Sequence, residues 1–182
     1  LSQLVTEMNA NVVLKELQSY CHHRDCAFVV ATVECVSAIA RRVPSVSEHC
    51  IRGLMTLVRT CSEEQVVAAS VVAIRRLLRF APGERVSGVR CLVRLLKAVT
   101  APTARASIVW IAGEYADIIP ELAPDVLRIL AKNFSNESVE VKAQILNFAM
   151  RLYMRIGDKS QQIETKGFAE DTVRKLFRYV VE

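Results

Sequence analysis

Apolar residues recur along this chain at the three- to four-residue spacing of amphipathic helices, and short breaks with proline or glycine interrupt them. The pattern predicts helices joined by short loops, and no sheet. The expected helices cover residues 9–21, 26–42, 47–60, 63–80, 84–99, 103–118, 121–133, 137–156 and 169–181. Ser45 with Glu48, and Ser62 with Gln65, have the spacing of capping boxes, so we expect each pair to cap a helix start.

Three prolines mark an internal repeat. Pro44, Pro82 and Pro120 each lie 38 residues from the next, and the segments around them align without gaps. The segments after the prolines, for example, read "IRGLMTLV", "VRCLVRLL" and "LRILAKNF". Two helices in about 40 residues are typical of the HEAT/armadillo class of α-solenoid. We therefore expect residues 1–182 to form a single all-α solenoid segment of about four antiparallel helix pairs. The alternative, one helical bundle with accidental spacing, fits three gapless matches less well.

The run "ARASIVWIAGEYADIIP" before the third proline has almost no polar face and holds the only tryptophan, Trp110. A first helix of an inner repeat contacts its pair mate and both neighbouring repeats, so it keeps little surface for water. We therefore expect Trp110 to be largely buried and Gly113 to have a structural role. Glu114 and Asp117 are expected to form a thin wet edge, or to pair with Arg105 or with a neighbouring repeat.

Composition and charge narrow the functional classes. The chain has 182 residues, of which 52% are hydrophobic and only 6% aromatic, a profile that favours helices packed through small aliphatic side chains. The formal net charge is +5, but residues 41–105 hold twelve basic against four acidic side chains. Such a block can attract phosphates, anionic lipid or an acidic partner. Aromatic stacking platforms for nucleic acid are not visible in the sequence, so we expect no nucleic acid partner.

Basic residues also recur at equivalent positions of the second helices. Arg52, Arg90 and Arg128 share one repeat position, and other pairs share a second and a third. Two structural explanations compete with binding: complementarity of the basic residues to the helix dipole, and bridges between repeats. The candidate basic interaction face comprises Arg52, Arg59, Arg75, Arg76, Arg79, Arg90, Arg94, Lys97, Arg128 and Lys132.

Clusters with catalytic or metal-binding character are weak. "CHHRDC", Cys21 to Cys26, places its donors side by side at a helix end, whereas zinc requires four converging ligands. There is no G-x-S-x-G and no glycine-rich phosphate loop. We expect no enzyme, catalytic residue, cofactor or metal, and reduced cysteines in the cytosol. No apolar run reaches the length of a membrane span, and no secretory signal is recognised.

Two stretches resemble one known family. "RASIVWIAGEY" is similar to the signature region of β-adaptins, the large β subunits of heterotetrameric vesicle adaptor complexes. "LAPDVLRILAKNF" is most similar to the β subunit of adaptor complex three, and "VLKELQSY" and "VVAASVVAIRRLL" match the same family. The resemblance covers most of residues 10–156 and fades after Gly157.

The resemblance implies a non-enzymatic scaffold: an internal part of an α-solenoid trunk that acts in endosome-to-lysosome or vacuole-type sorting. The implied partners are a medium, a small and a second large adaptor subunit, Arf-family GTPases and an anionic membrane surface. The implied location is cytoplasmic and peripheral, on endosomal or Golgi-derived vesicles. The alternative function is a basic HEAT-repeat binder of nucleic acid or nuclear-transport cargo.

Overall fold

A computed structural model describes residues 4–158, and over this range every regular element is helical. The α-helices are α1 (Ala10–Tyr20), α2 (Cys26–Arg42), α3 (Ser47–Thr60), α4 (Glu64–Leu77), α5 (Arg85–Leu95), α6 (Pro102–Glu114), α7 (Ala123–Lys132) and α8 (Val139–Asp158). Short 3₁₀ turns connect several of them: η2 (Pro44–Val46), η3 (Pro82–Glu84), η4 (Ala116–Ile118) and η5 (Phe134–Asn136). The helix predicted at 169–181 lies outside the described residues.

The helix starts reproduce the sequence repeat. The first helices α2, α4 and α6 begin at Cys26, Glu64 and Pro102, and each start lies 38 residues after the previous one. The second helices α3, α5 and α7 begin with the same step. The all-α solenoid predicted from the sequence is therefore confirmed. Proline opens the 3₁₀ turn of the first two pairs, whereas Pro120 follows the turn η4.

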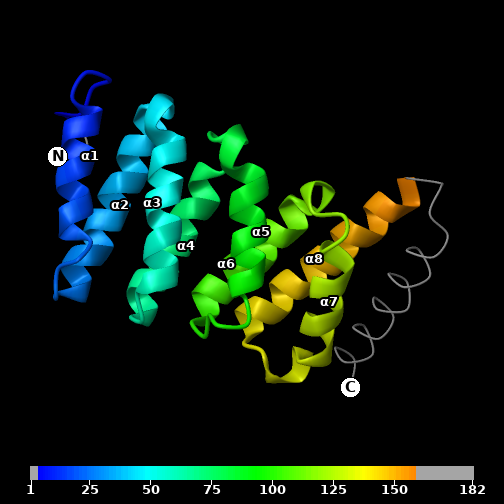
Figure 1. Ribbon diagram of the computed structural model, residues 1–182. Helices are drawn as coiled ribbons and strands as arrows, with labels where there is room; N and C mark the ends of the chain where they lie inside the picture. The colour runs from blue at the N-terminus through cyan, green and yellow to red at the C-terminus, as the bar shows by residue number, and fades with distance from the viewer. Residues whose placement is uncertain (1–3, 159–182) are drawn as a thin grey trace. The chain divides into compact units, whose positions relative to one another are not determined.

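The chain divides into two compact units, Leu1–Ala104 and Arg105–Glu182, so the expectation of one continuous segment stays a prediction. In the first unit α4 packs against both α2 and α3, and α2 also contacts α1 (Figure 1). Ile39, Val71 and Ile74 are completely buried between these helices. The core therefore runs from one helix pair to the next, as stacked repeats require.

The second unit is built from most of α6, α7 and α8. Ile108, Ile111 and Leu127 are completely buried, and Phe148 of α8 is almost completely buried. Trp110 is buried over most of its surface, but not completely. The aliphatic residues on either side of it fill the core, and the larger indole lies at the margin of the core, where it still has an interaction partner.

The predicted capping boxes are wrong. The 3₁₀ turn η2 leads directly into α3, whose N-cap is Val46 and not Ser45. The N-cap of α4 is Glu63, and its side chain makes no capping hydrogen bond. The sequence reading missed the cap of α2: the Asp25 side chain accepts a hydrogen bond of 2.9 Å from the backbone N–H of Ala27. Asp25 belongs to the "CHHRDC" stretch, which is therefore a helix-end turn.

The contrast between these two helix starts is testable. Asp25→Ala removes a side-chain acceptor from the first turn of α2, which should lower the free energy of unfolding by about 1 kcal/mol. Ser62→Ala is the matched control, because Ser62 is exposed and caps nothing at α4. It should change stability by less than about 0.5 kcal/mol. Chemical denaturation of the two variants measures both values, and equal losses would contradict the assignment.

Candidate interaction surface

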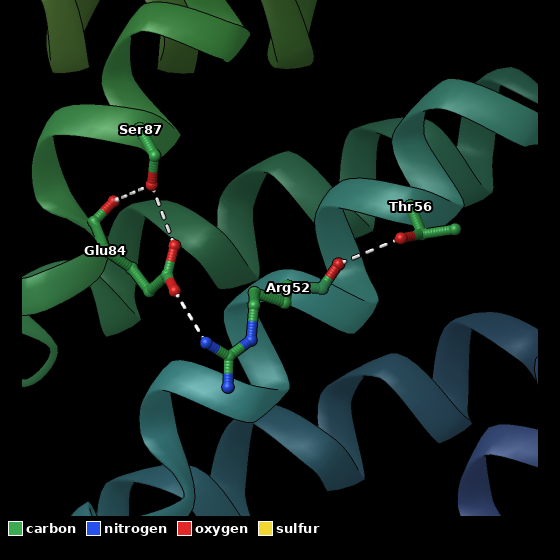
Figure 2. Close-up of polar contacts among 4 residues, drawn as sticks. All are labelled: Arg52, Thr56, Glu84 and Ser87. Atoms are coloured by element: carbon green, nitrogen blue, oxygen red, sulfur yellow. Dashed lines mark hydrogen bonds and ion pairs between the residues drawn. The ribbon is translucent and has the colours of Figure 1, made fainter.

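Arg52 on α3 bridges to the next helix pair. Its guanidinium Nη1 donates to Glu84 Oε1 at 2.9 Å, although 60% of the arginine side chain is exposed (Figure 2). Ser87 at the start of α5 donates from its hydroxyl to the other carboxylate oxygen of Glu84 at 2.8 Å, which fixes the carboxylate in place (Figure 2). The bridging alternative therefore accounts for Arg52.

Arg59, two turns further along the same face of α3, also contacts α5. Its Nη2 and Nε donate to the sulfur of Cys91 at 2.8 and 3.3 Å. The guanidinium group thus spans two consecutive pairs, although no carboxylate takes part. Both arginines of α3 therefore bind residues of the next helix pair.

Arg90, Arg94 and Lys97 are different, because they are exposed and form no ion pair with any residue that the structure describes. The position 38 residues after Glu84 is Leu122, so the sequence offers Arg90 no carboxylate equivalent to the partner of Arg52. Arg90 and Arg94 lie one turn apart on α5. Lys97 follows the end of the helix at Leu95, in a hydrogen-bonded turn, so the three cations do not share one continuous helix face.

The remaining basic candidates lie on other elements. Arg75 and Arg76 are in the last turn of the first helix α4, and Arg79 follows it, so they are not part of the α5 surface. Arg75 and Arg79 each have an interaction partner. Arg128 on α7 pairs within its own helix, with Asp125 at 3.1 Å, and Lys132 is exposed in the last turn of that helix.

Polar contacts join both ends of the family-like run of α6 to α8 or to the turn directly before it, where Glu137 lies. Arg105 pairs with Glu137, and its Nε donates to Glu137 Oε2 at 3.0 Å. Near the other end of α6, Arg151 pairs with Glu114. Glu114 therefore binds the next helix pair, one of the alternatives that the sequence left open. The partners Glu137 and Arg151 were not found from the sequence, because no acidic or basic residue recurs at the equivalent positions of the preceding repeat.

Arg155 completes this junction. Its guanidinium is 3.3 Å from Asp117 Oδ2, and it donates to the backbone carbonyl oxygens of Gly113 and Glu114 at 3.3 and 3.1 Å. These carbonyls end α6 and have no partner within the helix, so a cation from α8 satisfies them. The pairs Arg105–Glu137, Glu114–Arg151 and Asp117–Arg155 together form what we call the α6–α8 clamp.

Gly113 allows the backbones of α6 and α8 to approach each other. A Cβ atom at Gly113 would lie 3.3 Å from Phe148 Cα and 3.3 Å from Phe148 Cδ2. The first of these atoms is backbone and cannot move aside cheaply. The structural role expected for Gly113 is therefore explained by contact with α8.

The cysteines are all free thiols. Burial raises the pKa of Cys50 to about 11, and it also raises the pKa of Cys21, so both are unreactive in the sense that they are poorly ionised near neutral pH. Across residues 4–158, no three His, Cys, Asp or Glu side chains gather as a metal site would require. The described helices also include none with the length and hydropathy of a bilayer span.

Comparison with known proteins places these features in one family. The model of the adaptin N terminal region matches residues 1–179. The chain belongs to the adaptin family. The clamp residues Arg105 and Glu114, together with Gly113, lie in the stretch that carried the family resemblance, so adaptin-like residues of α6 take part in its contacts with α8 and the turn before it.

Within the family the chain is similar to β subunits. It is 40% identical over 154 residues to AP-3 complex subunit beta-1 of Mus musculus, which covers 85% of this chain and 14% of that protein. It is 34% identical to AP-3 complex subunit beta of Dictyostelium discoideum, over 100% of this chain and 20% of that protein. The similarity to AP-1 complex subunit beta-1 of Mus musculus is lower, at 30%. The chain therefore spans a small part of the length of these relatives.

The fold agrees with a structure of an assembled complex. A chain in a structure titled "Homology model of the full-length AP-3 complex in an intermediate open conformation" superposes with a TM-score of 0.78 and 28% sequence identity. The match covers 98% of this chain and 32% of that one. The solenoid seen here is thus the adaptin type.

Gly113 can be compared with a second glycine inside a helix. Gly113→Ala should destabilise the protein by about 1–3 kcal/mol, because the added methyl group meets the backbone of Phe148. Gly53→Ala is the matched control: its nearest neighbour would be Gln18 Nε2 at 3.7 Å, so the higher helix propensity of alanine should stabilise by up to about 1 kcal/mol. Thermal unfolding of both variants should give shifts of opposite sign.

One ion pair of the α6–α8 clamp should contribute more to the free energy of unfolding than an exposed ion pair on α7. The side chains of Arg105 and Glu137 are only 18% and 10% exposed, so Glu137→Gln should cost about 1–3 kcal/mol by leaving a partly buried guanidinium without its counter-charge. In the control, Arg128→Gln removes an arginine that is 46% exposed and should cost less than about 1 kcal/mol. Urea unfolding measures the difference, and a larger loss for Arg128→Gln would refute the ranking.

Proposed function

We propose that this chain works as a non-enzymatic scaffold segment of the large β subunit of a vesicle adaptor complex of the AP-3 kind. The match of residues 1–179 to the adaptin N terminal region carries this proposal. The names of the similar β subunits and of the superposed complex support the choice of AP-3. Its task is to hold other adaptor subunits during sorting from endosomes to lysosomes or vacuole-like organelles.

The proposed partners follow from the same comparison. They are the medium, small and second large subunits of the complex, with recruitment to endosomal or Golgi-derived membranes by an Arf-family GTPase and by anionic lipid. The location is accordingly cytoplasmic and peripheral to the membrane. A scaffold of this kind requires rigid joints between helix pairs, and the bridges from Arg52 and Arg59 to α5 are such joints.

The surface proposed for subunit assembly is the α5 cation cluster, defined as Arg90, Arg94 and Lys97. These side chains are exposed, and the described residues supply them with no carboxylate. Exposed cations that the protein does not neutralise can accelerate and orient docking onto an acidic protein surface. The matched arginine Arg52 is excluded from the cluster because Glu84 already binds it.

The decisive experiment combines a charge reversal with a charge-preserving control. Arg90→Glu, Arg94→Glu and Lys97→Glu together should leave folding intact, because none of the three has an ion pair to lose among residues 4–158. The variant should bind the medium, small and second large subunits at least about tenfold more weakly at low salt, and the difference should shrink as salt screens the charges. Co-purification and surface-binding measurements with the full-length chain report both effects.

The control exchanges the residues without changing their charge: Arg90→Lys, Arg94→Lys and Lys97→Arg. It should assemble like the original chain. If the reversed chain unfolds, the cluster is a structural bridge. If it assembles normally, the cluster has no role in assembly, and salt-sensitive binding of RNA by the original chain would favour the nucleic-acid alternative.

A further inference from the structure

Two turns of the first unit lie at one edge of the helix stack. Helices α2 and α4 pack side by side, and both end at the upper edge of the unit in Figure 1. The turns η2 and η3 follow them at that edge, and α3 and α5 start there (Figure 1). Residues from two consecutive repeats, 38 positions apart in sequence, are therefore brought to the same edge.

This edge is strongly basic. Arg41 and Arg42 lie in the last turn of α2, and Arg75 and Arg76 lie in the last turn of α4. The acidic side chains at the start of α3 and in η3 are Glu48 and Glu84, and the second of these is already bound by Arg52 and Ser87. The arginines at this edge are Arg41, Arg42, Arg75, Arg76, Arg79 and Arg85.

The opposite edge of the same unit has no such excess. The turn from α1 to α2 holds Arg24 and Asp25, and the turn from α3 to α4 is followed by Glu63 and Glu64. The last turns of α3 and α5 add Arg59 and Arg94, and Lys97 follows α5, so four cations there face the three acids Asp25, Glu63 and Glu64. The two edges therefore differ in charge, and a negatively charged plane would attract the basic edge more strongly than the other.

Local structure accounts for part of the basic edge only. Arg85 donates from Nε to the carbonyl oxygen of Leu78 at 2.8 Å and from Nη2 to that of Arg79 at 2.7 Å, so it caps the end of α4. Arg41 and Arg76 are exposed, and neither has an ion pair or a side-chain hydrogen bond within the described residues. Capping therefore leaves two arginines for which the described part of the chain supplies no partner.

Apolar side chains project at the same edge. Phe80 and Val86, on either side of η3, are 45% and 46% exposed. The exposed Phe28, by contrast, lies at the start of α2 and packs against the rings of Tyr20 and His23, with ring centroids 5.5 and 4.9 Å apart. Exposed apolar side chains among cations are typical of surfaces that lie in the headgroup region of anionic membranes.

We propose that this surface, which we name the arginine edge, binds an anionic lipid membrane. The arginine edge consists of Arg41, Arg42, Arg75, Arg76, Arg79, Phe80, Arg85 and Val86. The inference rests on the proposed membrane association and assigns it to a surface separate from the α5 cation cluster. A lipid plane suits the edge better than a peptide does, because the cations are spread over two turns and none of these residues lines the cavities of about 300 and 210 Å³ in this unit.

The test is flotation of the full chain with vesicles of phosphatidylcholine containing phosphatidylserine, against phosphatidylcholine alone. Arg41→Gln with Arg76→Gln should weaken binding about fivefold for each arginine removed, the usual contribution of a cation at an anionic surface. The matched control, Lys15→Gln with Arg24→Gln, removes the same charge from the middle of α1 and from the opposite edge. It should weaken binding less than about twofold, since most of its effect is screened by salt. Circular dichroism and the thermal midpoint should be unchanged in both.

A second variant separates insertion from attraction. Phe80→Ser with Val86→Ser keeps every charge, and it should weaken binding most at high salt, where the electrostatic attraction is screened. Equal losses for the two glutamine variants, or no binding of the original chain to the anionic vesicles, would overturn the proposal. So would normal vesicle binding by the Arg41 and Arg76 variant together with lost binding to polyglutamate, because that result assigns the edge to an acidic polypeptide.

The outcome is independent of subunit assembly. The Arg41 and Arg76 variant should assemble with the other adaptor subunits as the original chain does, whereas the α5 charge reversal should retain vesicle binding. If the original chain assembles normally but does not prefer vesicles that contain phosphatidylserine, the membrane proposal for the arginine edge is refuted and the scaffold proposal is unaffected.

Discussion

Each helix pair in this protein can bury its apolar surface only by packing on the next pair. Helix α4 illustrates the constraint, because it contacts its predecessor α2 and also α3, and Val71 and Ile74 of α4 have no exposed surface. A fixed step of 38 residues keeps equivalent apolar positions in register from pair to pair. The packing of the helix pairs determines which polar side chains come close enough to form the bridges.

The sequence predicted the frame well and the polar contacts poorly. Helices α2 and α3 were predicted with their observed bounds, because apolar periodicity and the repeat both mark them. The helix ends were less accurate: α5 was expected to reach residue 99 but ends at Leu95. Propensity and periodicity do not distinguish a last helical turn from the 3₁₀ and bent turns that follow it.

Caps and bridges depend on geometry that the spacing of residues does not contain. Ser62 and Gln65 have the right separation for a capping box, yet α4 starts after Glu63 without a side-chain cap. Trp110 was expected to be largely buried from its place in a first helix, but the spacing does not show that its aliphatic neighbours are completely buried while the indole keeps some exposed surface. Three arginines at one repeat position likewise have three environments: Arg52 bridges to Glu84, Arg128 pairs within its helix, and Arg90 has Leu122 at the position equivalent to Glu84. The repeat keeps an arginine at the same position of each second helix, but the residue that it binds depends on what the surrounding helices place next to it.

The α6–α8 clamp has a mechanical consequence. Its ion pairs lie near both ends of α6, and Gly113 lets the two backbones touch between them. Sliding α8 along α6 by one turn would break all three pairs at once and drive a side chain of α8 against the close approach at Gly113. We therefore expect the junction to resist shear, because a slip of α8 along α6 has no intermediate position in which any of the three pairs is kept.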